Sequence, residues 1–216
     1  MNKEVIIQKT ANFAKKKLSG AGNGHDFWHV YRVWKMATLL AQKEGADLFV
    51  VQLAALLHDI ADWKFSDSDK AGGILSRKWL KSLKVEELII QEVCEIVDNL
   101  SFKGAGVANK LKSIEGFVVQ DADRLDTLGA MGIARTFAFG GHEQREIYNP
   151  AEKPKLHQTF AAYKKSRSSS INHFYEKLLL LKDRLNTKSA KKIANHRHKF
   201  MEAYLQEFFD EWEAKK

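Results

Sequence analysis

A histidine and an aspartate stand side by side at the end of the most apolar segment of this sequence. Residues 50–57 are apolar nearly all round and lead directly into His58 and Asp59. A helix of that composition should lie in the middle of the fold. A buried carboxylate is unfavourable unless it is paired, hydrogen-bonded or bound to a metal. The position of His58 and Asp59 therefore calls for a partner.

Two residues elsewhere in the chain could complete a metal site with this pair. His29 lies in the amphipathic segment before the apolar run, and Asp123 lies among apolar neighbours further on. Two imidazoles and two carboxylates, with water in the remaining positions, suit an octahedral divalent ion such as Mn²⁺, Mg²⁺, Fe²⁺ or Co²⁺. A closed structural zinc site would be richer in cysteine. Each of the four residues, taken alone, also fits an ordinary core histidine or a capping aspartate.

Amphipathic helices are expected to position these residues. Asp26 and Asp47 can each cap a helix, and Gly45 can end the first of the two. No convincing period-2 strand is present, so we expect an all-α fold, a compact helical bundle. Residues 140–169 are the weakest region for regular structure, because they hold both prolines. Helices are predicted at about 4–18, 26–44, 47–57, 69–83, 85–99, 107–115 and 117–138, and two more lie between about 170 and 213.

Length and composition indicate one globular domain. The 216 residues suffice for a single domain 1–216, with a metal-site core at about 24–126 and C-terminal helices at about 170–213. The net charge of +8 favours anionic partners, although a solvated basic surface explains it as well. No aromatic-and-basic RNA module or zinc-finger spacing is present, so nucleic acid is not the expected partner.

The expected location is the cytoplasm, without a membrane anchor. The single cysteine, Cys94, lies in an apolar run and reads as a small core residue, and one cysteine forms no internal disulfide. The first residues lack the apolar core of a signal peptide. No apolar run approaches the roughly 18 residues that span a bilayer.

The order His29, His58-Asp59, Asp123 resembles the H…HD…D signature of the HD superfamily of metal-dependent phosphohydrolases. The flanking sequences resemble a bacterial subfamily of small single-domain HD hydrolases over essentially the whole chain. The resemblance implies an HD-type helical bundle with one divalent ion bound by these four residues. Mn²⁺ is our first choice, ahead of Mg²⁺, Co²⁺, Fe²⁺ or Ni²⁺. The stretches that carry the resemblance are 24–33, 54–64, 119–126, 132–141 and 173–178.

The fourth ligand is the least secure of the set. Asp121 and Asp126 compete with Asp123 for that position, and the motif alignment favours Asp123. Asp126 lies three residues after Asp123, on the same side of a helix, and could support it by a hydrogen bond.

Proton transfer in a phosphohydrolase needs a further acidic group near the metal. Asp62, one helical turn past Asp59, is the first candidate, and several HD phosphatases place an acidic residue there. Asp67 is the second candidate. A surface carboxylate explains Asp62 equally well. No GxSxG elbow or suitable cysteine offers a covalent route, so a metal-activated water is the expected nucleophile.

Basic side chains near the motifs are candidates for binding the phosphates. Arg32 lies one turn beyond His29, Lys64 and Arg124 flank motif residues, and His25 precedes His29 by four residues. Each could also be an ordinary surface group. Two other interpretations concern neighbouring aromatic and histidine side chains. Trp28 and Trp63 are expected to be core or pocket wall rather than base-stacking platforms, although an aromatic residue in a pocket wall could do both. His196 and His198 are expected to lie on an exposed helical surface.

A nucleotide is the expected substrate. The resembling group implies a nucleoside triphosphate pyrophosphohydrolase, which releases a monophosphate and pyrophosphate. The alternatives are a nucleoside 5′-monophosphate phosphatase and, in a different class, a metal-bound nucleotide sensor with little turnover. A nucleic-acid-binding protein is a distant third, and its affinity would fall steeply with salt. An apolar helix face could support a homodimer, which the sequence does not decide.

Overall fold

The computed structural model describes residues 2–18, 26–60, 70–100, 109–156 and 168–216, and every regular element within these ranges is helical. The all-α prediction is therefore confirmed. Tertiary contacts divide the chain into two compact units. Among the described residues, those up to 100 and 109–123 form the first unit, and those from 124 onward form the second. That residues 1–216 fold as one domain stays a prediction.

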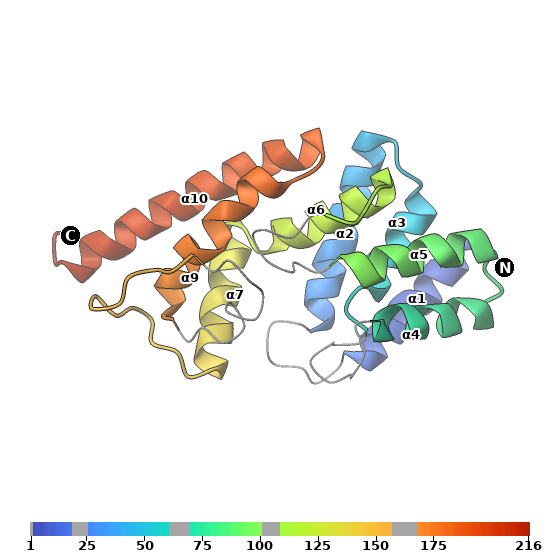
Figure 1. Ribbon diagram of the computed structural model, residues 1–216, viewed down its shortest axis with the longest axis horizontal. Helices are drawn as coiled ribbons and strands as arrows, with labels where there is room; N and C mark the ends of the chain where they lie inside the picture. The colour runs from blue at the N-terminus through green and yellow to red at the C-terminus, as the bar shows by residue number, and fades with distance from the viewer. Residues whose placement is uncertain (1, 19–25, 61–69, 101–108, 157–167) are drawn as a thin grey trace. The chain divides into compact units, whose positions relative to one another are not determined.

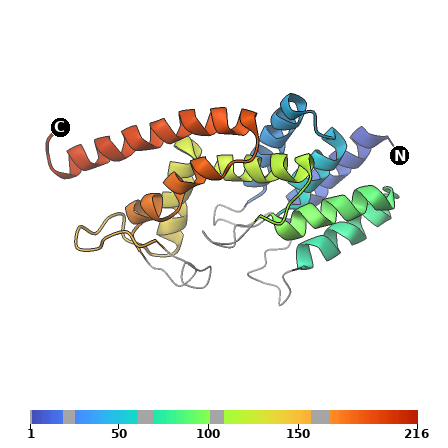
Figure 2. The same cartoon turned by 45° about the horizontal axis from the view of Figure 1, so that its top comes forward.

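The first unit is built around a short, almost wholly buried helix, α3 (Leu48–Leu57). It packs against α1 (Lys3–Lys17), α2 (Phe27–Glu44) and α5 (Glu87–Asn99), and α4 (Ala71–Ser82) pairs with α5 (Figures 1 and 2). Because neighbouring helices surround α3, its sequence is apolar on all sides rather than along one stripe. The interior position predicted for this segment is confirmed.

Capping residues fix where the two motif-bearing helices begin and end. The side chain of Asp26 accepts a hydrogen bond from the His29 backbone N–H at 3.0 Å and so starts α2. Gly45 ends α2 in the left-handed conformation, with a φ of 73°. Asp47 accepts from the N–H groups of Phe49 and Val50 and starts α3. All three caps agree with the sequence prediction.

A close approach of α4 to α5 depends on Gly73. Its N–H donates to Asp98 Oδ1 at 2.9 Å, and a Cβ at this position would stand only 2.5 Å from the same carboxylate. Cys94 is buried nearby and donates from Sγ to the Gly73 carbonyl at 3.2 Å. The interpretation of Cys94 as a small core residue is confirmed.

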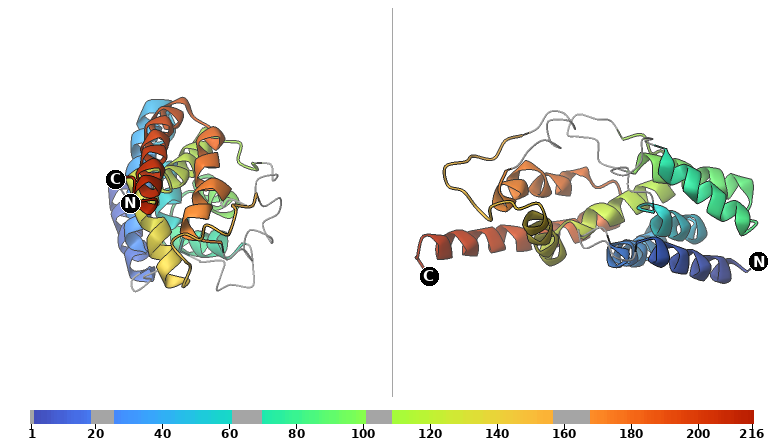
Figure 3. Two further views of the ribbon diagram at one scale, coloured as in Figure 1. Left: turned by 90° about the vertical axis from the view of Figure 1, so that its left-hand side faces the viewer. Right: turned by 90° about the horizontal axis from the view of Figure 1, so that it is seen from below.

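The second unit contains the end of α6 (Ile114–Asp126), α7 (Gly129–His142), α9 (Ser170–Glu176), the 3₁₀ helix η2 (Leu178–Arg184) and α10 (Lys188–Trp212). The long α10 packs on α7 and η2, and α9 contacts both α7 and η2. Seen from below, α7 lies nearly end-on while α10 runs across the view (Figure 3, right). Phe174 and Met201 are fully buried in this unit's core.

Two helix predictions around α6 are wrong. Residues 109–113 of the expected helix 107–115 are not helical, and α6 begins at Ile114. The expected run 117–138 is interrupted after Asp126, and Gly129, with a φ of 72°, starts α7. A glycine meets the left-handed conformation at little cost, and a Cβ there would press on Arg197 at 3.0 Å.

The C-terminal helices also differ from the prediction. The first breaks at Lys177 and continues as the 3₁₀ helix η2. The buried residues of α10 include His198, which was expected to be exposed. The others are Ala190, Ala194, Met201 and Leu205. Two aromatic residues of α10, Phe200 and Trp212, are half exposed.

None of the helices in the described part of the chain combines the length and the apolar character required to cross a bilayer.

Truncation of α3 at its centre should destabilise the first unit. Leu53 is fully buried, so Leu53→Ala should lower the free energy of unfolding by about 2–5 kcal/mol through lost burial and the cavity left behind. Leu88→Ala is the matched control, because Leu88 is 78% exposed. Denaturant unfolding followed by circular dichroism measures both, and equal effects of the two substitutions would contradict the central role of α3.

His173 in α9 should make stability depend on pH. Burial, together with the positive charges of Lys177 and Arg145, lowers the pKa of His173 from 6.5 to about 3. Between these values the unfolded chain binds a proton that the folded chain does not bind, so the free energy of unfolding falls as the pH falls. His173→Gln should therefore flatten the decline between pH 6.5 and pH 4.

The contribution of one such histidine is at most about 1.4 kcal/mol per pH unit. Denaturant unfolding at half-unit pH steps gives the slope for the native chain and the variant. His196→Gln, at an exposed position of α10, is the matched loss of an imidazole. An unchanged slope in His173→Gln would refute the attribution of this pH dependence to His173.

Candidate metal centre

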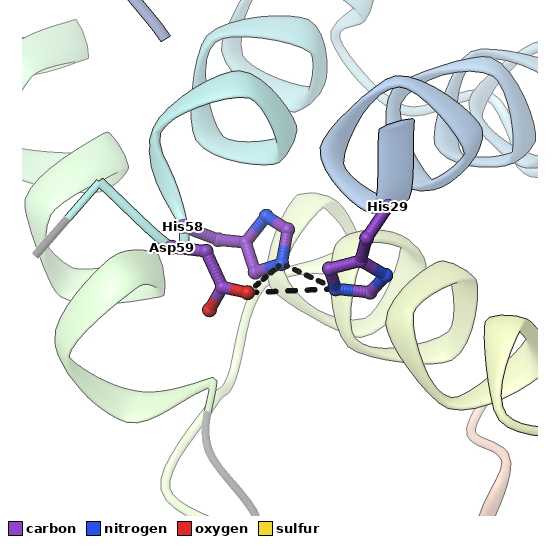
Figure 4. Close-up of side chains that lie close together, drawn as sticks. All are labelled: His29, His58 and Asp59. Atoms are coloured by element: carbon purple, nitrogen blue, oxygen red, sulfur yellow. Dashed lines mark hydrogen bonds and ion pairs between the residues drawn. The ribbon is translucent and has the colours of Figure 1, made fainter. Parts of the chain in front are cut away.

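Four side chains from three helices converge in the first unit. His29 projects from the first turn of α2, His58 and Asp59 follow the end of α3, and Asp123 comes from α6. The two Nε2 atoms of His29 and His58 are 3.3 Å apart. Asp59 Oδ2 is 3.5 Å from the first and 3.6 Å from the second, and Figure 4 shows the three side chains pointing toward one another.

Asp123 joins this group through His29. Its Oδ1 lies 3.4 Å from His29 Nε2. Asp121 is fully buried, whereas Asp126 accepts a 2.8 Å hydrogen bond from Arg135 within the second unit. The contact of Asp123 with His29 supports the assignment made from the motif.

A hydrogen bond orients the imidazole of His58. Its Nδ1 is 2.8 Å from the carbonyl oxygen of Ala55, which accepts a proton and does not donate one. Nδ1 therefore carries the hydrogen in the neutral ring, and the lone pair of Nε2 faces His29 and Asp59. The hydrogen bond from His58 to Ala55 was not predicted from the sequence. Helical spacing could have indicated it, because a side chain at the end of a helix can reach the carbonyl three residues earlier.

The donor set fits a divalent cation. The three nearest ligand atoms, from His29, His58 and Asp59, all lie within 4.8 Å of one another. Adjacent ligands of an octahedral ion with bonds near 2.1 Å are about 3 Å apart, slightly less than the 3.3–3.6 Å measured between neighbouring donors here. Nitrogen and carboxylate donors without thiolate suit Mn²⁺, Mg²⁺, Fe²⁺ or Co²⁺.

The charge state of Asp123 suits a ligand. Burial raises the pKa of its carboxyl group, but the hydrogen bond with His29 and the positive charges of His29 and His58 lower it more. The net result is a pKa well below the ordinary value, so Asp123 is ionised at neutral pH. A carboxylate must be in this form to bind a metal ion.

The remaining predicted site residues are only partly within the described chain. Arg32 is half-buried on α2, one turn beyond His29. Arg124 donates a hydrogen bond from Nη1 to the Arg184 carbonyl within the second unit. The roles of both in phosphate binding stay predictions. His25, Asp62, Lys64 and Asp67 lie outside the described residues.

Comparison with known proteins identifies the class to which this arrangement belongs. The model of the HD domain family matches residues 27–128, a range that contains His29, His58, Asp59 and Asp123. The chain belongs to the HD superfamily and is a metal-dependent hydrolase, and HD domains bind divalent metal ions.

Several relatives resemble the chain over nearly its whole length. An HD-superfamily hydrolase from Bacillus thuringiensis is 44% identical, with a TM-score of 0.79, and the match covers 99% of this chain and 100% of the other. A protein of Lactobacillus plantarum is 38% identical with a TM-score of 0.86, over 99% and 100% of the two chains.

The Bacillus subtilis protein YpgQ is a third relative. It is 37% identical over 191 residues, which are 88% of this chain and 85% of YpgQ. The crystal structure of YpgQ in complex with ADP matches with a TM-score of 0.79, at 32% identity over 98% of this chain and 97% of that one.

Loading the site with metal should stabilise the protein. A ligand at 100 times its Kd adds about 2.7 kcal/mol to the free energy of unfolding, so Mn²⁺ should raise the Tm of chelator-treated protein. Asp59→Asn should abolish this rise, because it removes one anionic ligand and leaves a weak amide oxygen. Asp183→Asn, at an exposed position of η2, should leave the rise intact.

Bound manganese per chain, measured by elemental analysis after dialysis, accompanies the thermal scans. An equal rise of the Tm in Asp59→Asn and in the native chain would place the metal elsewhere.

Proposed function

We propose that this chain is a divalent-metal-dependent phosphohydrolase that acts on nucleotides, with cleavage of nucleoside triphosphates to a monophosphate and pyrophosphate as its main reaction. The observation that carries the proposal is the convergence of His29, His58, Asp59 and Asp123 in a donor set suited to a hard divalent ion. The complex of YpgQ with ADP and the net charge of +8 support a polyanionic nucleotide.

The four converging residues would hold the metal, with Mn²⁺ as the first choice. A bound divalent ion supplies an activated water and polarises the phosphoryl oxygen under attack. The hydrogen bond from His58 Nδ1 to Ala55 keeps Nε2 available as a donor atom. The negative charges of Asp59 and Asp123 balance the charge of the cation, which reduces the cost of placing it beside two buried histidines.

Other residues of the chain would handle the proton and the phosphates. Asp62, or failing it Asp67, accepts the proton from the attacking water. The water oxygen bonds to the α-phosphorus, the bond from that phosphorus to the oxygen bridging to the β-phosphorus breaks, and pyrophosphate leaves with its electron pair. Arg32, with Lys64, Arg124 and His25, binds the phosphate oxygens, for which a guanidinium is suited by its two parallel N–H donors.

A product assay tests this reaction. Chelator-treated protein is given Mn²⁺, Mg²⁺ or Co²⁺ singly and a panel of nucleoside mono-, di- and triphosphates, with phosphate and pyrophosphate measured separately. We expect metal-dependent release of pyrophosphate from triphosphates. Asp59→Asn should lower the rate by at least about a hundredfold, because the activated water and the charge stabilisation are lost together.

The same assay separates the alternatives. Release of phosphate from monophosphates would show that the same site carries out a monophosphatase reaction and not a pyrophosphohydrolase reaction. Tight stoichiometric binding of nucleotide without turnover would show that the protein is a nucleotide sensor. Asp62→Asn and Asp67→Asn, compared at saturating metal, decide which carboxylate takes the proton, because only loss of that group should lower kcat.

A further inference from the structure

Aromatic rings line the first two turns of α2, the helix that also carries His29. Trp28 stands edge-on to Tyr31, with ring centroids 5.9 Å apart and an interplanar angle of 81°, and Tyr31 stands edge-on to Trp34 at 6.1 Å and 80°. Phe27 packs tilted against Trp28 at 5.7 Å. Edge-to-face pairs of this kind are favourable for aromatic rings. The row therefore holds Trp28 from one side.

The far end of the row is anchored. Trp34 donates from Nε1 to Gln52 Oε1 on α3 at 2.9 Å. The Lys35 ammonium lies 5.8 Å from the ring centroid of Tyr31 and 5.9 Å from that of Trp34, which is within cation–π range. The anchored row restricts the indole of Trp28, so less side-chain freedom is lost when a ligand binds.

Trp28 itself is 57% exposed, although the sequence analysis expected it to be core or pocket wall. A single exposed aromatic residue is ordinary on a protein surface. Trp28 differs from such a residue in two respects. It directly precedes His29 in α2, and its ring contacts Phe27 and Tyr31 while much of its surface stays accessible.

The helix geometry sets the relation between this ring and the metal centre. Adjacent residues of an α-helix diverge by about 100°, so Trp28 lies beside His29 and not over it. Arg32 follows Trp28 by four residues and His29 by three, so it neighbours both on the helix surface. A metal centre, a guanidinium and an aromatic ring thus follow one another around α2. A nucleotide has phosphates at one end and a flat base at the other, separated by a ribose.

We propose that Trp28 is the stacking platform for the base of the nucleotide whose phosphates bind at the centre formed by His29, His58, Asp59 and Asp123. The assignment rests on the proposed function of that centre. Every base has a π face, so stacking tolerates all of them. Trp28 then selects nucleotides over inorganic polyphosphates and does not choose among bases.

Binding of ADP and of pyrophosphate in the presence of Mn²⁺, measured by calorimetry, tests the platform without any need for turnover. Both ligands carry a diphosphate, and only ADP has a base. Trp28→Ala should weaken ADP about tenfold, the loss of one stacking contact, and leave pyrophosphate unchanged. Trp28→Phe keeps an aromatic face and should restore most of the affinity for ADP.

Trp212→Ala is the matched control, because Trp212 is 49% exposed on α10, and it should change neither affinity. Unchanged ADP binding in Trp28→Ala, or equal weakening of ADP and pyrophosphate, would overturn the proposal. Unchanged pyrophosphate binding shows at the same time that the variant is folded. If ADP binding depends on Trp28 but no nucleotide is cleaved, the proposed reaction is refuted and the assignment of Trp28 as the stacking platform stands.

Discussion

The close approach of two imidazole nitrogens and two carboxylate groups is the constraint on which the first unit depends. His29 and His58 face each other through Nε2 atoms 3.3 Å apart. Asp59 Oδ2 lies within 3.6 Å of both nitrogens, and Asp123 Oδ1 lies 3.4 Å from that of His29. The two carboxylates need a positive charge beside them, and the deprotonated Nε2 atoms offer lone pairs to a bound cation. A divalent ion satisfies all four groups at once, and this requirement accounts for polar residues at the end of the most apolar helix.

The surrounding structure holds these groups in place. The central helix α3 presents His58 and Asp59 from the interior of the unit, and α2 packs against it to bring up His29. Asp26 caps the start of α2 by accepting from the His29 backbone N–H, and the Ala55 carbonyl fixes the ring of His58. Ligand atoms carried by capped helices are positioned better than atoms carried by loops, so little rearrangement is needed when a metal ion binds.

Family membership and site chemistry answer different questions about this chain. The HD match and the donor set establish a metal-dependent hydrolase. The proposed preference for a nucleotide would depend on groups around the metal. Arg32 and Trp28 share the first turns of α2 with His29, so one helix would carry a metal ligand, a phosphate contact and a base platform. Such a helix would couple recognition of the substrate to the metal through a single rigid element.

The sequence by itself determined the all-α class, the caps of α2 and α3, and the residue types of the metal centre, because local hydrogen bonds and apolar periodicity act over a few residues. It did not determine the break at Gly129, the 3₁₀ turn after Lys177, the burial of His198 or the exposure of Trp28. Each of these depends on what packs against the segment. The motif favoured Asp123 among three chemically equal aspartates, and only the tertiary structure showed its contact with His29, because that contact depends on how α6 packs.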